Sequence, residues 1–383
     1  MVYFGMGYLP DLNAVACREQ ALRSIIAESG YTPVLIGVSN NIPFGTFEKS
    51  EYNGATCYSI KYARTPIEKL KDVYTIKKTL VRIFDDIGVE KIKCFIMQDY
   101  QFGAMKRIKR YCRRNGIAYV ADIMDWFTPT RDSSMVKNIA KTVDTYFRMH
   151  WFYPALENKI YISHKFAHHF CYGQNKNTMV LPCTCTDVAE PSDYTVEKNG
   201  NITVTFAGFL GLKCEKEKLD WIIRALYENG SKIRLNVIGI SKEDFISRVP
   251  ELSACITDHI CFFGYLPRTE CVDVLRKSDF SIIARKSNKL TEYGFSSKIC
   301  EAFSHAIPVI ATNNSDNGVY IKDGVNGYIC DANYQSLKQV LKRVEESDRD
   351  LMVAMHEHII SDNPLSTKRY VESFVGFMES LIV

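Results

Sequence analysis

The chain has 383 residues, which is long for a single hydrophobic core and sufficient for two domains. Hydrophobic residues make up 46% of it and charged residues 24%, and this composition excludes an intrinsically disordered protein. The net charge of +4 is too small to indicate a nucleic-acid-binding protein. The 13 cysteines are irregularly spaced, which excludes a small disulfide framework, so we expect reduced thiols.

The first half of the chain alternates apolar runs with segments of helical periodicity, a pattern that predicts a parallel sheet covered by helices. The apolar start has no basic lead and no cleavage site, so we interpret it as a strand and not as a signal peptide. No stretch reaches the roughly 18 apolar residues that span a bilayer, and we expect a cytoplasmic protein. The expected strands are 1–7, 32–38, 93–98, 117–123 and 159–163, and the expected helices are 14–29 and 75–87.

Polar side chains follow two of these expected strands, where ligands of such sheets bind. The loop after the first strand ends at Asn13 and Ala14, and the fourth strand ends near Asp122 and Asp125. Structural interpretations remain open, because Asn13 and Asp125 are also suited to capping helices.

Residues 105–114 predict a strongly basic helix. Met105, Ile108 and Cys112 share one face of it, and six cations occupy the remainder: Lys106, Arg107, Lys109, Arg110, Arg113 and Arg114. A polybasic helix of this kind is typical of proteins that bind an anionic membrane surface. The alternative is a solvated helix whose apolar face packs on the sheet, so we expect surface attachment and not insertion.

Between 186 and 201 the sequence becomes polar and rich in turn residues, and we place an interdomain linker there. The alternation then resumes, so the predicted fold is α/β with two Rossmann-like doubly wound domains facing a cleft. We expect domains at 1–190 and 191–365, and a helix within 366–383 that returns toward the first domain. The expected strands are 202–207, 233–238, 259–263, 280–284 and 308–312, and the expected helices are 219–228, 268–277 and 297–305.

A second helix start combines several groups that bind anions. The basic residue Arg285 is followed by Ser296 and Ser297, and then by Lys298 and Glu301 on one helical face. Free backbone N–H groups, hydroxyls and a lysine at a helix N-terminus suit a diphosphate, and the carboxylate one turn later can accept hydrogen bonds from ribose hydroxyls. A lysine and a glutamate at this spacing more often form an ordinary surface pair, so that interpretation of Lys298 and Glu301 stays open.

Two blocks in this half resemble the signature of the retaining GT-B glycosyltransferases of family four. The first contains GF at 294–295, EA at 301–302 and IPVI at 307–310, and the second is DGVNGY at 323–328. Weaker matches are VTFAG at 204–208 and FGYL at 263–266. The form SSK-x-x-E resembles a subgroup from polysaccharide gene clusters. Two positions depart from the family, because Tyr293 replaces the first of two glutamates, with Glu292 one position away, and Phe209 replaces an arginine.

The resemblance implies transfer of a sugar from a nucleotide-diphosphate donor, such as a UDP- or GDP-sugar, to a hydroxyl. The implied acceptor is a glycan or a lipid-linked molecule of surface polysaccharide synthesis, and the enzyme is expected to be a metal-independent hexosyltransferase without a cofactor. The implied donor-binding residues are Glu301, Lys298, Ser297, Ser296, Phe295, Arg285, Lys213, Gly208 and Tyr265. The candidate acceptor-binding residues are Asn13, Ala14 and Arg18, and the candidate catalytic residues are Asp125, Asp122, Arg285 and Lys298.

Two other functions remain open at this point. A catalytically inactive glycosyltransferase-like scaffold or nucleotide-binding protein is compatible with the altered glutamate and the missing arginine. The second open function is a sugar-nucleotide epimerase of the GT-B fold. We find no additional acid-base carboxylates or histidines in the sequence that such an enzyme would need.

Overall fold

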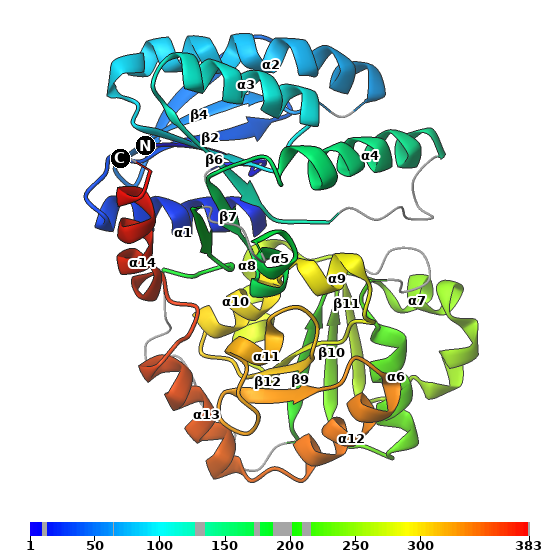
Figure 1. Cartoon of the computed structure of the whole chain (residues 1–383). Helices are drawn as coiled ribbons and strands as arrows, with labels where there is room; N and C mark the ends of the chain where they lie inside the picture. The colour runs from blue at the N-terminus through cyan, green and yellow to red at the C-terminus, as the bar shows by residue number, and fades with distance from the viewer. Residues whose placement is uncertain are drawn as a thin grey trace. The chain divides into compact units, whose positions relative to one another are not determined.

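The computed structural model describes residues 1–9, 14–63, 65–126, 135–171, 177–186, 201–208 and 216–381. Two compact units are present. Met1–Thr186 and Thr367–Val383 form the N-terminal unit, and Asp187–Ser366 form the C-terminal unit. Each unit is an α/β structure in which a largely parallel sheet is buried among helices (Figure 1).

An eight-stranded sheet in the order β3-β4-β2-β1-β5-β6-β7-β8 forms the centre of the N-terminal unit. Neighbouring strands are parallel, except that β3 runs antiparallel to β4. The strands are β1 (Val2–Phe4), β2 (Val34–Ser39), β3 (Phe47–Tyr52), β4 (Ala55–Lys61), β5 (Cys94–Gln98), β6 (Ala118–Ile123), β7 (Lys159–Tyr161) and β8 (Thr178–Val180). The helices are α1 (Ala14–Glu28), α2 (Pro66–Ile87), η1 (Val89–Lys91), α3 (Phe102–Arg114), α4 (Met135–Phe147), the π-helix η2 (Arg148–Phe152), α5 (His164–Cys171) and α14 (Lys368–Glu379).

The hairpin of β3 and β4 was absent from the predicted elements, although its turn has a clear local cause. Asn53 and Gly54 both have positive φ, at 47° and 74°, as the two central residues of a type I′ turn require. Helix α2 begins earlier than predicted because Thr65 and Glu68 form a capping box that satisfies two backbone N–H groups.

The last helix of the chain, α14, belongs to the N-terminal unit. It packs beside α1 and against β8, and Figure 1 shows red α14 next to blue α1. Phe374, Phe377 and Met378 of α14 join the same hydrophobic core as Leu22 and Ile25 of α1. The chain therefore crosses to the C-terminal unit and returns.

All strands of the C-terminal unit are parallel, in the order β11-β10-β9-β12-β13-β14. The strands are β9 (Thr203–Ala207), β10 (Arg234–Ile238), β11 (Ile260–Gly264), β12 (Phe280–Ile283), β13 (Val309–Thr312) and β14 (Gly327–Cys330). The helices are α6 (Leu219–Glu228), α7 (Lys242–Arg248), η5 (Pro250–Cys255), α8 (Arg268–Arg276), α9 (Lys289–Tyr293), α10 (Ser297–Ser304), α11 (Asn317–Tyr320), α12 (Tyr334–Glu345) and α13 (Arg349–Ser361).

The predicted α/β fold with two Rossmann-like units is confirmed, and the expected strands of the second half lie within a residue or so of the observed ones. Most of their side chains are apolar and buried among the covering helices, whereas those of the edge strand β11 are largely intermediate or exposed. None of the helices within the described residues is long and apolar enough to cross a lipid bilayer.

Candidate functional site

The strand order of the C-terminal sheet places a candidate site at the ends of β9 and β12. The order reverses between these two neighbours, and ligands of doubly wound sheets bind outside the carboxyl ends of the strands at such a switch point. Gly208 follows β9, and Arg285 lies two residues beyond β12. Two of the predicted donor-binding residues therefore lie at the edge of the sheet where a ligand is expected.

Gly208 permits a close approach of side chain and backbone at this edge. A Cβ atom at position 208 would lie 2.5 Å from Lys298 Nζ, and a Cβ at Gly239 would overlap the carbonyl oxygen of Gly208. Gly239 also has a positive φ of 104°, which favours glycine. Glycine at both positions therefore allows Lys298 and the backbone to pack closely at the switch point.

A buried ion cluster forms the centre of the candidate site. The Glu217 carboxylate accepts a hydrogen bond from Arg285 Nη2 at 2.7 Å and one from Lys298 Nζ at 2.8 Å. The side chains of Glu217 and Arg285 are 3% and 9% exposed, and that of Lys298 is 24% exposed. Two cations share one carboxylate, so the cluster carries an excess positive charge in a site with little water.

The pKa values of the cluster follow from burial and from these charges. Burial raises the pKa of Glu217, but Arg285 and Lys298 outweigh it and lower this pKa to about 2. Burial lowers the pKa of Lys298, and the charge of Glu217 partly opposes that effect. The Arg285 backbone N–H also donates to Thr312 Oγ1 at 2.8 Å, which links β12 to β13. Glu217 therefore stays ionised and positions both cations.

Glu217 was absent from the predicted site. It lies in a short charged run before α6, and no local spacing in the sequence marks it. Its partners are 68 and 81 residues away along the chain, so only the fold brings them together. Lys213, which was predicted to bind the donor, lies outside the described residues.

Helix α10 contributes Lys298 to this cluster, and Ser296 is at the N-cap position of the helix. The Ser296 side chain does not cap the helix, and its buried hydroxyl has no hydrogen-bond partner among the described residues. Ser297 is partly exposed. A buried hydroxyl without a partner is costly, so a ligand that accepts its hydrogen bond would be stabilised.

Lys298 and Glu301, which were predicted to share a helical face, have different partners. Lys298 binds Glu217, whereas the Glu301 carboxylate is 38% exposed and lies 3.8 Å from Arg268 Nε. The surface-pair interpretation of Lys298 with Glu301 is not what the structure shows. Glu301 remains accessible from solvent.

Two other predicted donor residues lie in different surroundings. Phe295 is buried, and its ring packs on Tyr320 with centroids 5.2 Å apart. Tyr265 is 89% exposed at the end of the edge strand β11. Glu292, next to the position of the altered glutamate, accepts hydrogen bonds from Ser287 Oγ at 2.7 Å and Asn314 Nδ2 at 3.1 Å.

In the N-terminal unit the structure corrects two predictions. Asp122 is fully buried and accepts hydrogen bonds from Tyr3 at 2.8 Å and from Arg18 Nη2 at 2.9 Å. Arg18 is also buried and donates to the carbonyl oxygens of Leu181 and Pro182. Both side chains are used in packing this unit, so neither is available to contact an acceptor.

Asp125 differs from Asp122 because its side chain is exposed. Its backbone N–H donates to Asp99 Oδ2 at 3.0 Å, as does that of Met124 at 2.8 Å, and these bonds hold the turn after β6. Asn13 and the side chain of Ala14 lie outside the described residues.

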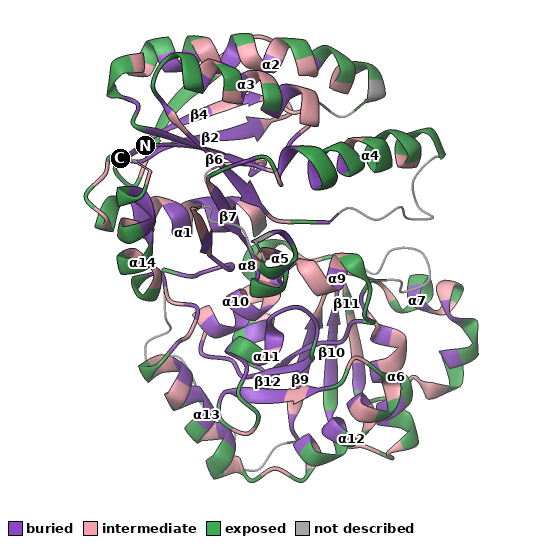
Figure 2. Ribbon diagram, in the orientation of Figure 1, coloured by how far each residue is buried: buried purple, intermediate pink, exposed green. Residues whose placement is uncertain are grey.

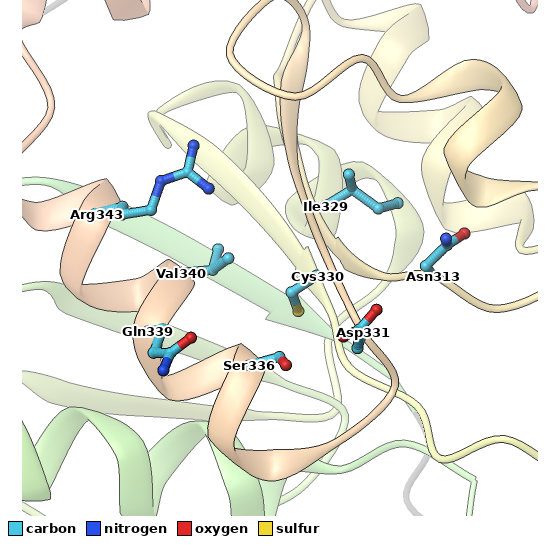
Figure 3. A pocket seen from close by; sticks show the side chains of 8 residues that line it. All are labelled: Asn313, Ile329, Cys330, Asp331, Ser336, Gln339, Val340 and Arg343. Atoms are coloured by element: carbon cyan, nitrogen blue, oxygen red, sulfur yellow. The ribbon is translucent and has the colours of Figure 1, made fainter.

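A separate hollow of about 300 Å³ lies between β14 and α12 of the C-terminal unit. Figure 3 shows that Ser336, Gln339 and Arg343 line it from the helix, opposite Cys330 and Asp331. Arg343 is exposed and forms an ion pair with Asp323 at 2.8 Å. Because β14 is an edge strand, this hollow is away from the switch point of the sheet.

Comparison with known proteins gives a family match that covers most of the C-terminal unit. Residues 198–361 match the family described as glycosyl transferases group 1. The C-terminal unit contains a glycosyltransferase group 1 domain. No curated protein matches the chain in sequence.

Solved structures that resemble the chain cover nearly all of it. A glycosyltransferase from Rickettsia africae ESF-5 has a TM-score of 0.65 at 13% identity, covering 100% of this chain and 98% of that one. Sucrose-phosphate synthase from Thermosynechococcus elongatus has a TM-score of 0.67 at 10% identity, with coverages of 99% and 98%. HepE from Anabaena, in complex with UDP and glucose, has a TM-score of 0.63 at 13% identity, with coverages of 99% and 99%. The chain therefore has the GT-B fold, and the group 1 domain supports the glycosyltransferase class of enzyme.

Proposed function

We propose that this protein is a retaining glycosyltransferase of GT-B family four that moves a hexosyl group from a nucleotide-diphosphate sugar to a hydroxyl. The observation that carries the proposal is the buried cluster of Glu217, Arg285 and Lys298 at the switch point of the C-terminal sheet. Its excess positive charge is matched by the negative charge of a diphosphate.

The donor in this proposal is a UDP- or GDP-sugar. Support comes from the GT-B structures of HepE with UDP and of an Escherichia coli trehalose-6-phosphate protein bound with UDP-2-fluoro glucose. The diphosphate would lie against Arg285, Lys298 and the start of α10, where Ser296 and Ser297 offer hydroxyl groups. Glu301, which is accessible one turn into the helix, would accept hydrogen bonds from the ribose hydroxyls.

Catalysis in this proposal is electrostatic. As the bond between the sugar and the diphosphate breaks, negative charge accumulates on the leaving phosphate oxygen. Arg285 and Lys298 are held in place by Glu217 before the reaction begins, so they stabilise that charge without reorganisation. Because two cations supply this charge, we propose that the enzyme works without a metal ion or a cofactor.

The acceptor in this proposal is a glycan or a lipid-linked intermediate of surface polysaccharide synthesis, and the enzyme acts at the cytoplasmic face of the membrane. Asp125 is our proposed acceptor base, since its carboxylate is exposed at the end of a strand. An Asp125→Asn variant should then lose turnover while its nucleotide affinity stays unchanged.

Calorimetry with UDP, GDP, TDP and CMP tests the donor site. We expect one nucleoside diphosphate to bind, and Arg285→Ala to weaken it roughly 10- to 100-fold through the loss of charged hydrogen bonds. The matched control is Arg343→Ala, which removes an exposed arginine of the same unit at the hollow of Figure 3. Equal losses in both variants, or no nucleotide binding by the native chain, would contradict the proposal.

A further inference from the structure

Helix α4 of the N-terminal unit exposes its apolar side chains to solvent. Of its 13 residues, all of which the structure describes, Thr145 alone is buried. Met135 is 78% exposed and Val136 is 70% exposed, and Ile139 and Val143 follow on the same face. Figure 2 shows α4 as exposed along almost its whole length. An amphipathic helix ordinarily buries this face, so α4 presents it to something other than its own core.

The apolar surface continues from α4 onto its neighbours. Phe147 of α4 stacks on Phe102 at the start of α3, with centroids 5.5 Å apart, and contacts Trp151 of the π-helix. Arg107 of α3 lies 4.1 Å from the ring centre of Tyr74 of α2. We name this surface the α4 face, which comprises the exposed side chains of Ile67, Leu70, Tyr74, Met135, Val136, Ile139, Val143, Tyr146, Phe147 and Trp151. Exposed apolar side chains gathered on neighbouring elements in this way mark an interaction site.

Basic residues surround the α4 face. Lys137 and Lys141 of α4 are exposed, and both lie close enough to Lys69 of α2 for their charges to lower its pKa, after the larger effect of burial. Among the described residues, Asp144 pairs with Arg148 at 2.9 Å, and its charge also opposes the lowering of the Lys69 pKa. The three lysines bring positive charge to this side of the α4 face, which an anionic surface would complement.

We propose that the α4 face binds an anionic lipid bilayer, with its apolar side chains in the interfacial region and the lysines at the headgroup phosphates. This deepens the membrane association proposed above and rests on that proposal. A helix with an apolar face, flanking lysines and an exposed tryptophan is suited to lying in the plane of a membrane interface. A second copy of the chain fits less well, because a twofold contact would bring Lys137 and Lys141 toward their own counterparts.

The basic helix α3 packs its apolar face within the N-terminal unit, as the alternative interpretation of its sequence expects. Ala104, Met105, Ile108 and Cys112 are all buried, so α3 has no apolar face to place in a bilayer. Its exposed cations, which include Lys106 and Arg110, add long-range attraction that is screened by salt. In this proposal α4 contacts the bilayer directly, and the cations of α3 attract the protein to the anionic surface from a distance.

Vesicle sedimentation tests the proposal with phosphatidylcholine alone and with phosphatidylcholine containing phosphatidylglycerol. We expect binding to the mixed vesicles, reduced about tenfold or more by Ile139→Asp with Val143→Asp. Lys137→Glu with Lys141→Glu should remove the preference for the anionic lipid. The matched control is Tyr227→Asp with Leu351→Asp, which makes the same chemical change at exposed apolar positions of the C-terminal unit and should bind as the native chain does.

Tryptophan fluorescence reports the same contact at one residue. Trp151 is 64% exposed on the α4 face, whereas Trp126 is buried. Mixed vesicles should shift the emission of the native chain to the blue, and Trp151→Phe should abolish most of that shift. A shift that persists in Trp151→Phe would show that another surface binds the lipid.

The remaining outcomes separate this inference from the proposed function. Nucleotide affinity, measured by calorimetry, should be the same in the α4-face variants and in the native chain. Nucleotide binding without vesicle binding overturns the membrane contact and leaves the transferase proposal standing. Vesicle binding without nucleotide binding overturns the transferase proposal and leaves the membrane contact standing. If the native chain is a dimer that Ile139→Asp with Val143→Asp makes monomeric, and no vesicle binds, the α4 face is an interface between copies.

Discussion

The two units each contain a buried ion cluster, and the clusters differ in their balance of charge. In the N-terminal unit one cation, Arg18, meets one carboxylate, Asp122, and the remaining bonds of Arg18 go to backbone carbonyls. In the C-terminal unit Arg285 and Lys298 share Glu217. A balanced pair whose cation also binds backbone carbonyls has a structural role, whereas an excess of one charge at a switch point is suited to a ligand of the opposite charge.

The largest expected effect concerns the balanced cluster. Asp122→Ala leaves Arg18 buried without its partner, and we expect the free energy of unfolding to fall by about 3–5 kcal/mol. Urea unfolding, with hydrogen exchange to locate the loss in the N-terminal unit, measures it. Asp125→Ala is the control, since this exposed carboxylate should change stability by only about 0.5 kcal/mol. A small effect at Asp122 would remove the structural role that distinguishes the two clusters.

The next prediction concerns how the stability that the unbalanced cluster contributes depends on pH. The folded chain holds the pKa of Glu217 at about 2, below the ordinary 4.5, so its stabilisation is complete above pH 4.5 and is lost as the pH falls toward 2. A shift of this size corresponds to roughly 3 kcal/mol. The stability difference between the native chain and Glu217→Gln should therefore shrink between pH 5 and about pH 2. A constant difference over that range would show that the two cations do not act on Glu217.

The third prediction concerns ligand binding by the unbalanced cluster, where the expected change in free energy is smaller. Lys298→Ala removes one of the two cations that are proposed to face the diphosphate, and we expect about tenfold weaker binding of a nucleoside diphosphate, or about 1.4 kcal/mol. Calorimetry gives the affinity, and thermal unfolding without nucleotide checks the fold. The control is Lys338→Ala, which removes a partly exposed lysine paired with Glu228. If both variants bind equally well, the excess charge has no role in binding.

The smallest expected effect belongs to Glu301. Its proposed bonds to the ribose hydroxyls predict that Glu301→Ala weakens UDP or GDP by about 1 kcal/mol, close to fivefold. Inorganic pyrophosphate, which has no ribose, should bind the variant and the native chain equally. A parallel loss with pyrophosphate would assign Glu301 to the phosphate region.

Local sequence patterns determined much of the fold. Apolar runs with intervening amphipathic segments predicted most strands because a strand between two helical layers must be apolar on both faces. The hairpin of β3 and β4 was missed because β3 is polar and exposed, although Asn53 and Gly54 carry its turn signal. For the site, Arg285 and Lys298 were predicted to act together, and the structure brings both onto Glu217.

The sequence by itself thus determined the α/β class, most of the elements and the helix start that contains Lys298 and Glu301, because these depend on residues within a few turns of one another. Only the tertiary structure decided which side chains meet. Arg18 and Asp122 are 104 residues apart, and Glu217 and Arg285 are 68 apart, so strand order and not spacing places them in contact. The same holds for α3 and α4: both are amphipathic in sequence, but packing buries the apolar face of α3 and leaves that of α4 exposed.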